Sequence, residues 1–427
     1  MLFDTPVILL TIICFFLPSW LLIITSVVGV LLADTRLVSG QYLYYARFVP
    51  PGVLFLKTIF LRGKISQFVD EPFLDPWKKW IPFIIFIFIS AFYADDPVTS
   101  IQRSISAVFV LIGFPMAVEY YLQDEDSQHK FMIILSVIFI FINIYAFYSI
   151  RNYASDAYID GRIKVFFRNP NSAGLTAMIS TLLFLYGTRM AATPVSRNIF
   201  FLNVLISGLM VFLSGSRASV LGLLMGLMTF YLMNLRLGHK KIRLMLAIMI
   251  VSFVMLTVVT LLFPQATERL FENDSSGRLI AWALGWNMFQ DTPFFGVGFG
   301  SSDLKMQIAG AQNPELYFYG VHNSYLRLLI ECGVIGLFLS AIPILYTMIK
   351  AWRSIVSVQN MQLNAVMMSL VVAGLVNAVF EDWLFGFGSS STVPFWLFFS
   401  ILSVQSIRAT DYNDMDAGNV AEEKYVE

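Results

Sequence analysis

The chain has 427 residues, of which 57% are hydrophobic and 13% are charged, and its mean hydropathy is +0.72. A soluble globular domain usually carries about 25% charged residues, so this composition excludes an ordinary soluble domain and indicates a protein that crosses a membrane several times. Lys plus Arg and Asp plus Glu are equal at 28 each, which leaves no net charge to indicate nucleic-acid binding. Two isolated cysteines and three histidines without a close pair argue against a disulfide framework or a zinc site, and we expect no metal and no other cofactor.

About twelve apolar stretches are long enough, or nearly so, to cross the roughly 30 Å of hydrocarbon in a bilayer. They lie at residues 5–33, 45–61, 79–94, 102–122, 129–150, 172–190, 197–214, 217–235, 241–263, 323–350, 361–380 and 392–407. The first stretch is too long for a cleaved signal peptide and lacks its basic region, so we interpret it as a retained span, which Pro18 could break in two. The sequence therefore predicts an all-α polytopic membrane protein of about 12 transmembrane helices.

The basic residues of the connecting loops predict which side of the membrane each loop faces. With the N-terminus inside, the inner loops contain Arg62, Lys64, Lys78, Lys79, Arg189, Arg197, Arg236, Lys240, Lys241, Arg243, Lys350 and Arg353. Four regions follow: helices 1 to 9 in 1–263, a long outer loop in 264–321, helices 10 to 12 in 322–407, and a tail in 408–427. The tail is acidic and has little apolar surface to bury, so we expect it to be cytoplasmic and disordered.

The outer loop is predicted to contain an amphipathic helix followed by a glycine-rich turn. After Arg278, apolar residues recur at helical spacing up to the sequence Asp-Thr-Pro at 291–293: Leu279, Trp282, Ala283, Trp286 and Phe289. With tryptophans at headgroup depth, such a helix would lie on the membrane surface. Gly296, Gly298 and Gly300 then alternate, and they form either a plain turn or a backbone cradle for an anion.

Two basic features lie beside other predicted outer segments. Arg217, in LSGSRASVLGL, separates two apolar stretches and either caps a helix hairpin or offers its guanidinium fork to phosphate oxygens. Before the sixth span, GRIKVFFRNPNSAGL contains Arg162, Lys164 and Arg168, and its sequence from Asn169 predicts a turn and a helix cap. This basic rim suits a diphosphate headgroup or anionic lipid.

His322 and Asn323 begin the tenth span, where an imidazole could act on a substrate that is half lipid and half polar. Arg327 and Glu331 follow four residues apart, and we expect them to form a structural ion pair. Glu331 lies on another side of the helix from His322, so it is a poor candidate to orient the imidazole. The acid pair Glu381 and Asp382 could approach His322 instead, or could be a solvated loop pair.

Three of these segments resemble the O-antigen ligase and O-antigen polymerase superfamily of bacterial envelope glycan enzymes: SGSRASVLGL, GRLIAWALGWNMFQDTPFFGVGFGSS and HNSYLRLLIECGVIGLF. The segment FRNPNSAGL gives weaker support, and the resemblance covers roughly the second half of the chain. It implies a mainly helical, GT-C-like architecture with many spans in the bacterial inner membrane. It also implies an active site that faces the periplasm.

The resemblance implies an inverting glycosyltransferase that needs no metal and takes its glycan from undecaprenyl diphosphate. The family's two essential arginines correspond to Arg217 and Arg278, which would hold the diphosphate. Its essential histidine corresponds to His322, which would help the acceptor hydroxyl attack the anomeric carbon of the sugar. Neighbouring residues are expected to bind the substrate: Arg168, Asn171, Gly298 and Asn323.

The acceptor divides the family, and other classes of function remain open. A ligase transfers the glycan to lipid A-core, whereas a polymerase transfers it to another lipid-linked repeat. The paired arginine-to-glycine loop motif of some polymerases has no convincing copy here, which favours a ligase.

A secondary transporter usually shows symmetric halves and charges at mid-membrane, whereas the notable charges here gather at one surface. A scaffold would need neither arginine nor His322.

Overall fold

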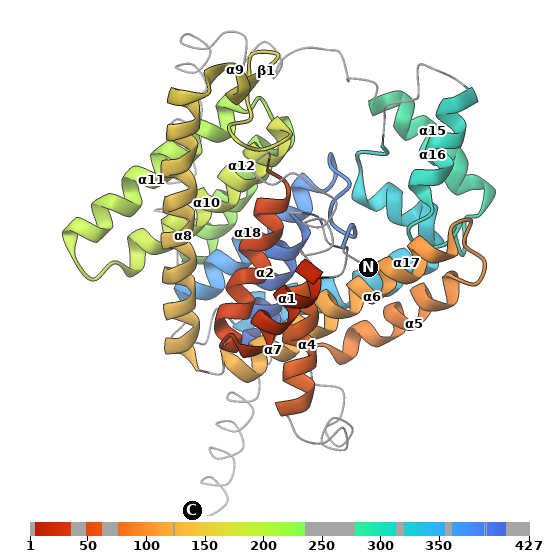
Figure 1. Cartoon of the computed structure of the whole chain (residues 1–427), viewed down its shortest axis with the longest axis horizontal. Helices are drawn as coiled ribbons and strands as arrows, with labels where there is room; N and C mark the ends of the chain where they lie inside the picture. The colour runs from red at the N-terminus through yellow and green to blue at the C-terminus, as the bar shows by residue number, and fades with distance from the viewer. Residues whose placement is uncertain are drawn as a thin grey trace, which may run out of the picture.

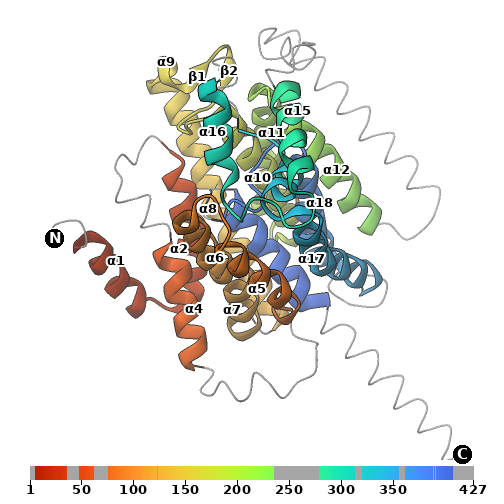
Figure 2. The same cartoon turned by 90° about the vertical axis from the view of Figure 1, so that its right-hand side faces the viewer.

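The computed structural model describes residues 5–35, 48–61, 76–122, 124–234, 278–312, 320–354, 361–387, 389 and 391–406. It is mostly helical, with 80% helix and 2% strand, as the apolar periodicity predicts. Figures 1 and 2 place the hairpin of β1 (Tyr158–Ile159) and β2 (Arg162–Ile163) at the same end of the molecule as the helices α15 and α16. The helices α4 and α7 lie at the opposite end.

The first half of the chain contains short apolar helices and one long one. They are α1 (Thr5–Phe16), α2 (Ser19–Ala33), α4 (Val49–Leu61), α5 (Ile81–Ser90), α6 (Pro97–Val108), α7 (Phe114–Tyr121), α8 (Glu125–Asn152) and the single turn α9 (Ala154–Ala157). Pro18 separates α1 from α2, so the first predicted span is a broken pair of helices. Between α6 and α7 the chain continues through a π-helical turn, Phe109–Gly113.

The second half contains the elements that carry the predicted site. They are α10 (Pro170–Met190), α11 (Pro194–Leu213), α12 (Arg217–Asn234), α15 (Arg278–Asp291), α16 (Ser302–Gln312), α17 (Ser324–Ser354), α18 (Met361–Asn377) and the last helix, Thr392–Ser406. The Asn169 side chain caps α10 by accepting a hydrogen bond from the Asn171 amide at 2.8 Å, as the sequence predicts.

Five of the described helices are long and apolar enough to cross a membrane by length and composition: Pro97–Tyr121, Glu125–Asn152, Pro194–Leu213, Arg217–Asn234 and Ser324–Arg353. Shorter apolar helices include Ser19–Leu31, Val49–Phe60, Met361–Asn377 and Thr392–Ser406. The predicted span at 241–263 and the first part of the outer loop lie outside the described residues. The chain is a helical membrane protein by these features, and the predicted total of about twelve spans stays a prediction.

The helix α17 is broken at Gly333, and the glycine-rich turn of residues 293–298 packs against the break. Gly333 has a φ of +63°, which favours glycine, and a Cβ there would lie 2.3 Å from the Phe294 carbonyl carbon. The amides of Val297 and Gly298 donate to the carbonyls of Ile330 and Glu331 at 2.9 and 3.0 Å. The turn therefore satisfies backbone groups that the broken helix leaves without helical partners.

Candidate functional site

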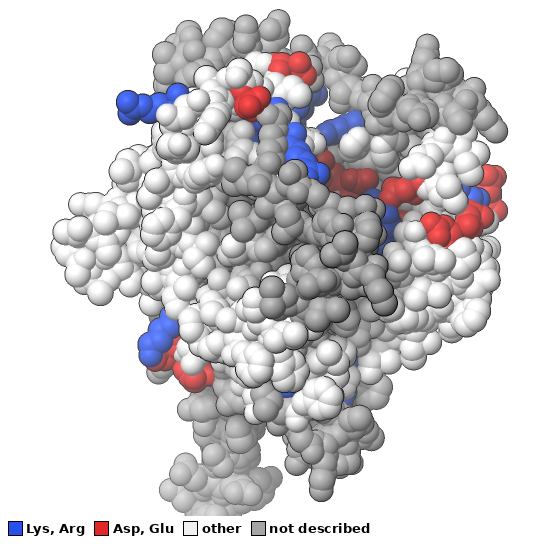
Figure 3. All heavy atoms as spheres, in the orientation of Figure 1, with Lys and Arg blue, Asp and Glu red and all other residues white. Residues whose placement is uncertain are grey.

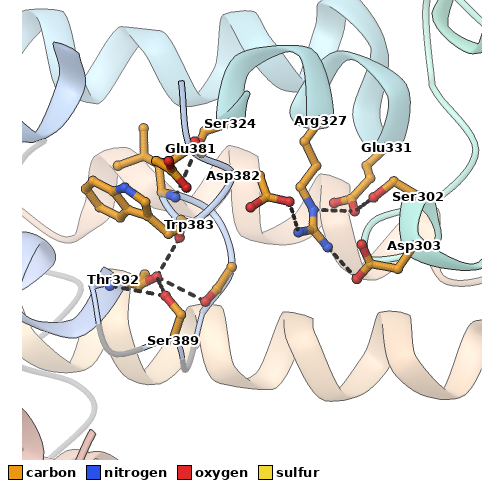
Figure 4. Close-up of polar contacts among 12 residues, drawn as sticks. Ser302, Asp303, Ser324, Arg327, Glu331, Glu381, Asp382, Trp383, Ser389 and Thr392 are labelled. Atoms are coloured by element: carbon orange, nitrogen blue, oxygen red, sulfur yellow. Dashed lines mark hydrogen bonds and ion pairs between the residues drawn. The ribbon is translucent and has the colours of Figure 1, made fainter. Parts of the chain in front are cut away.

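Glu381 joins three parts of the chain at one carboxylate. Its Oε1 accepts hydrogen bonds from Arg278 Nη2 at 3.0 Å and from Asn171 Nδ2 at 2.8 Å. Ser324 at the start of α17 holds the Glu381 backbone, because its amide and its hydroxyl both donate to the Glu381 carbonyl (Figure 4). The loop after α18 thereby fixes Arg278 of α15 beside the first turn of α10.

The same network reaches the loop before Arg217. Asn171 Oδ1 accepts from Arg162 Nη2 at 2.5 Å, and Arg162 Nε donates to the Ser214 carbonyl at 2.8 Å. Ser214 lies three residues before Arg217, whose exposed side chain begins α12. The structure thus connects the segments of the two predicted arginines through Glu381, Asn171 and Arg162.

His322 lies beside Arg278 and Asp382 at the start of α17. Its φ is +48°, a backbone conformation that non-glycine residues adopt infrequently, and its Nδ1 is buried without a hydrogen-bond partner among the described residues. Burial lowers the pKa of His322; the Asp382 carboxylate opposes that shift and the Arg278 guanidinium adds to it. The imidazole is therefore neutral near pH 7 and has a nitrogen available to accept a proton.

Burial raises the pKa of Glu381 to about 7. Arg278 and Arg162 lower this pKa, whereas the neighbouring Asp382 raises it. The Glu381 side chain is 15% exposed and that of Arg278 is 24% exposed. This acid pair is therefore no solvated loop pair, because Glu381 bonds Arg278 and Asp382 bonds Arg327.

Arg327 is the centre of a second charge cluster, shown in Figure 4. Its guanidinium contacts Glu331 at 3.1 Å, Asp303 at 2.7 Å and Asp382 at 3.4 Å. The contact with Glu331 confirms the ion pair that their spacing predicts, and Glu331 also accepts a hydrogen bond from Ser302 at 2.5 Å. Glu331 is therefore committed to this cluster and does not bond His322.

Arg103 of α6 joins this cluster from another side. It contacts Asp303 at 2.6 Å and Glu331 at 3.5 Å, and Lys305 contacts Asp95 at 3.4 Å. Burial raises the pKa of Asp303, but Arg327 and Arg103 outweigh burial, so its pKa is lower than usual. Figure 3 shows acidic and basic side chains gathered in a hollow between the β1–β2 end of the molecule and the lobe of α15 and α16.

Three predicted substrate-binding residues have structural contacts. The Gly298 amide donates to the Glu331 carbonyl, so it is not available to an anion, and the plain turn accounts for this glycine. Asn323 Oδ1 caps α17 by accepting from the amides of Tyr325 and Leu326, both at 3.0 Å. Arg168 is exposed, and its Nε donates to the Thr35 carbonyl at 3.4 Å. Asn171, in contrast, lies inside the Glu381 network.

The helix α15 has the predicted bounds, and small residues form the face that packs on α17. Among its described side chains, Ala281 and Gly285 are buried, and a Cβ at Gly285 would lie 3.1 Å from Leu326 and Ile330 of α17. Trp286 is 49% exposed, and Trp282 is half-buried beside Phe380. The small residues face α17 because they allow the two helices to approach closely. The spacing of the large apolar residues in the sequence does not reveal this contact face.

Sequence reasoning missed the roles of Arg103, Asp303 and Ser302. Asp303 begins α16 as an ordinary first-turn acid, and Arg103 lies in an apolar stretch. The available signal was an arginine inside a predicted span, which needs a partner in a bilayer. The identity of that partner depends on packing between segments 200 residues apart.

A family model described as O-antigen ligase matches residues 202–341. The match includes Arg217, Arg278 and His322, whereas Arg162, Asn171 and Glu381 lie outside it. None of the curated proteins matches the chain. The family match confirms the resemblance of the three sequence segments to the O-antigen ligase and polymerase superfamily, over about a third of the chain.

Proposed function

We propose that this protein is a glycosyltransferase that moves a glycan from undecaprenyl diphosphate to an acceptor hydroxyl at the periplasmic face of the bacterial inner membrane. The match to the O-antigen ligase family model supports an enzyme that handles glycans. The lipid-diphosphate donor, the inversion at the anomeric carbon and the periplasmic location of the active site are all part of the proposal. Arg217 and Arg278 hold the diphosphate, and His322 is the general base.

One observation carries this proposal: Arg278 lies in one polar region with the buried Nδ1 of His322, which has no hydrogen-bond partner in the described part of the chain. Transfer from a lipid diphosphate needs cations that stabilise the leaving group and a base for the acceptor. Arg278 has the fork geometry that fits phosphate oxygens, and His322 is neutral at pH 7 because burial lowers its pKa. Both requirements are met within the matched segment.

The reaction follows from these roles. The acceptor oxygen loses its proton to His322 and bonds the anomeric carbon, while the bond from that carbon to the diphosphate oxygen breaks. The electron pair of the broken bond stays on the diphosphate, whose charge the two arginines stabilise. Attack opposite the leaving group inverts the anomeric carbon, and no external nucleotide takes part.

We favour lipid A-core as the acceptor and keep a second lipid-linked repeat as the alternative. The ligase choice rests on the lack of a convincing polymerase loop motif in the sequence. The exposed Arg168, three residues before Asn171 in the sequence, suits a charged acceptor of either kind.

The test is transfer by the purified full chain in lipid nanodiscs, with EDTA and without nucleotide. Undecaprenyl-diphosphate glycan is supplied either with lipid A-core or alone, and products are resolved by gel and mass spectrometry. Transfer to the core identifies a ligase, and chain growth identifies a polymerase. Inertness with both would overturn the proposal and favour a transporter or a scaffold.

Two pairs of variants separate chemistry from folding. We expect His322→Ala and Arg278→Ala to abolish transfer in protein that still inserts and folds, because each removes a group that the reaction requires. The matched controls are His129→Ala, at a histidine that stacks on Tyr186, and Arg197→Ala, at an exposed arginine at the start of α11. Both controls should keep transfer, and normal turnover by His322→Ala would remove His322 from the site.

A further inference from the structure

The Glu381 carboxylate occupies the donors that a phosphate oxygen would need. Arg278 Nη2 and Asn171 Nδ2 converge on its Oε1 at 3.0 and 2.8 Å. An arginine and an amide that meet at one oxygen form the pattern that binds phosphate oxygens. The Glu381 carboxylate therefore stands where an oxygen of a bound anion would stand.

The backbone of Glu381 is held in place, which keeps its side chain near Arg278. The amide and the hydroxyl of Ser324 both donate hydrogen bonds to the Glu381 backbone carbonyl, at 3.1 and 2.6 Å. The side chain is 15% exposed, so water can replace few of its present contacts. A diphosphate that reaches Arg278 therefore meets a carboxylate at close range.

Such an encounter puts like charges together. The charged groups that face Glu381 are Arg278 from α15, Arg162 from β2 and the neighbouring Asp382. Asp382 is already engaged by Arg327, and Arg162 donates a hydrogen bond to Asn171, which in turn donates one to Glu381. When Arg278 and Arg217 both hold the diphosphate, an ionised Glu381 in this partly buried site would lose the cation that it contacts directly.

We propose that Glu381 holds the place of a donor phosphate group on Arg278 and takes up a proton when the diphosphate binds. This inference rests on the proposed function. Arg278 exchanges its bond with Glu381 for one with a phosphate oxygen, and a proton from the solvent neutralises the carboxylate. The neutral Glu381 can then donate its O–H to the same phosphate group, so the exchange leaves no buried charge unpaired.

Protonation is accessible near neutral pH because burial raises the pKa of Glu381 to about 7. The pKa of His322 lies below its usual value, so His322 does not change charge above pH 7. The donor is a diphosphate diester without an ionisable group in this range. Above pH 7, donor affinity should therefore fall about tenfold for each pH unit.

The experiment measures binding by the full chain in nanodiscs. The probe is N-acetylglucosamine linked through a diphosphate to farnesol, and its Kd is measured at pH 6.5, 7.5 and 8.5. Calorimetry at pH 8.5 in two buffers of different ionisation enthalpy counts protons taken up. We expect about one proton per probe for the wild-type chain. Because the proton count needs no variant, it tests the inference even if substitutions impair folding.

Glu381→Gln should bind the probe with a Kd that does not change with pH, and should bind more tightly than wild type at pH 8.5. Asp156→Asn, at an exposed acid of α9, is the matched control and should keep the wild-type slope. A wild-type Kd that is constant from pH 6.5 to 8.5 would overturn the role of Glu381 and leave the proposed function intact. A wild-type chain that does not bind the probe would overturn both.

Discussion

Arg278 and Glu381 are separated by 103 residues in the sequence, yet Arg278 Nη2 lies 3.0 Å from Glu381 Oε1. The contact joins the first residue of α15 to the loop that follows α18. Since Ser324 fixes that loop to the start of α17, the contact also sets the position of Arg278 beside His322. The loop after α18 thus positions a residue that lies within the segment matched by the family model, although the loop itself lies outside that segment.

Asn171→Ala is expected to weaken donor use without removing the chemical step. The substitution removes the bridge between Arg162 and Glu381, and it leaves the two charged groups with fewer partners in a partly buried place. We expect a loss of about 1–3 kcal/mol in stability and a raised KM for donor with kcat less affected. Steady-state kinetics and thermal unfolding measure both effects.

The matched control for this substitution is Asn152→Ala. Asn152 is exposed at the end of α8, and its carboxamide donates to the Tyr148 carbonyl one turn earlier. We expect wild-type KM and nearly wild-type stability for this variant. Equal effects of the two substitutions would mean that the bridge at Asn171 has no special role.

The acid side of the pH profile should report His322. Because burial lowers its pKa, His322 is mostly uncharged near pH 7 and becomes protonated as the pH falls. A protonated imidazole cannot accept the acceptor's proton, so kcat at saturating substrates should be constant above pH 7 and fall on the acid side. Measurement of kcat from pH 4.5 to 8 tests this, and a fall that begins well above pH 7 would contradict His322 as the base.

Arg327→Ala should destabilise the fold strongly. Arg327 is 8% exposed and contacts Glu331, Asp303 and Asp382, so its loss leaves the buried Glu331 and two partly exposed acids without their common partner. Removal of one partner from a buried ionic cluster costs about 3–5 kcal/mol. Arg353→Ala, at an exposed arginine near the end of the same helix, should have little effect on the thermal unfolding temperature.

A second variant distinguishes an ionic penalty from lost packing. The double substitution Arg327→Met with Glu331→Leu removes one charge of each sign and keeps most of the volume. It should recover part of the stability that Arg327→Ala loses, because fewer buried charges remain without a partner. A double variant less stable than Arg327→Ala would show that the ionic cluster itself, and not the unpaired acids, sets the stability.

Local rules predicted much of the fold. The break at Pro18, the cap at Asn169, the start of α15 at Arg278 and the pair of Arg327 with Glu331 all depend on residues a few positions apart. Fixed helical geometry makes such relationships readable from spacing alone.

The remaining relationships depend on how helices pack, which spacing does not determine. The helices α12 and α18 approach closely because Gly222 has no side chain: a Cβ there would lie 2.8 Å from the Ala373 carbonyl oxygen. Such approaches decide which distant residues meet, including Arg278 with Glu381 and Arg103 with Asp303. A single sequence shows which residues are charged, but it does not show which of them pair with one another.

Gly333→Ala should disrupt the junction between the glycine-rich turn and α17. Gly333 has a φ of +63°, and an added Cβ would lie 2.3 Å from the Phe294 carbonyl carbon, so both the backbone and the neighbouring turn would have to move. The amides of Val297 and Gly298 would then lose contact with the carbonyls of Ile330 and Glu331. We expect a loss of at least about 2 kcal/mol, measured by thermal unfolding, and a reduced transfer rate because Arg327 and Glu331 lie in the adjoining turn.

Gly208→Ala is the matched control, because Gly208 lies inside α11 and a Cβ there would meet nothing within 4 Å. Alanine is preferred to glycine in a helix by about 1 kcal/mol, so this variant should be as stable as wild type or slightly more stable. The two substitutions add the same methyl group, and therefore only the backbone conformation and the space around each glycine distinguish them. An unfolding temperature for Gly333→Ala equal to that of Gly208→Ala would show that the turn and α17 do not depend on this close contact.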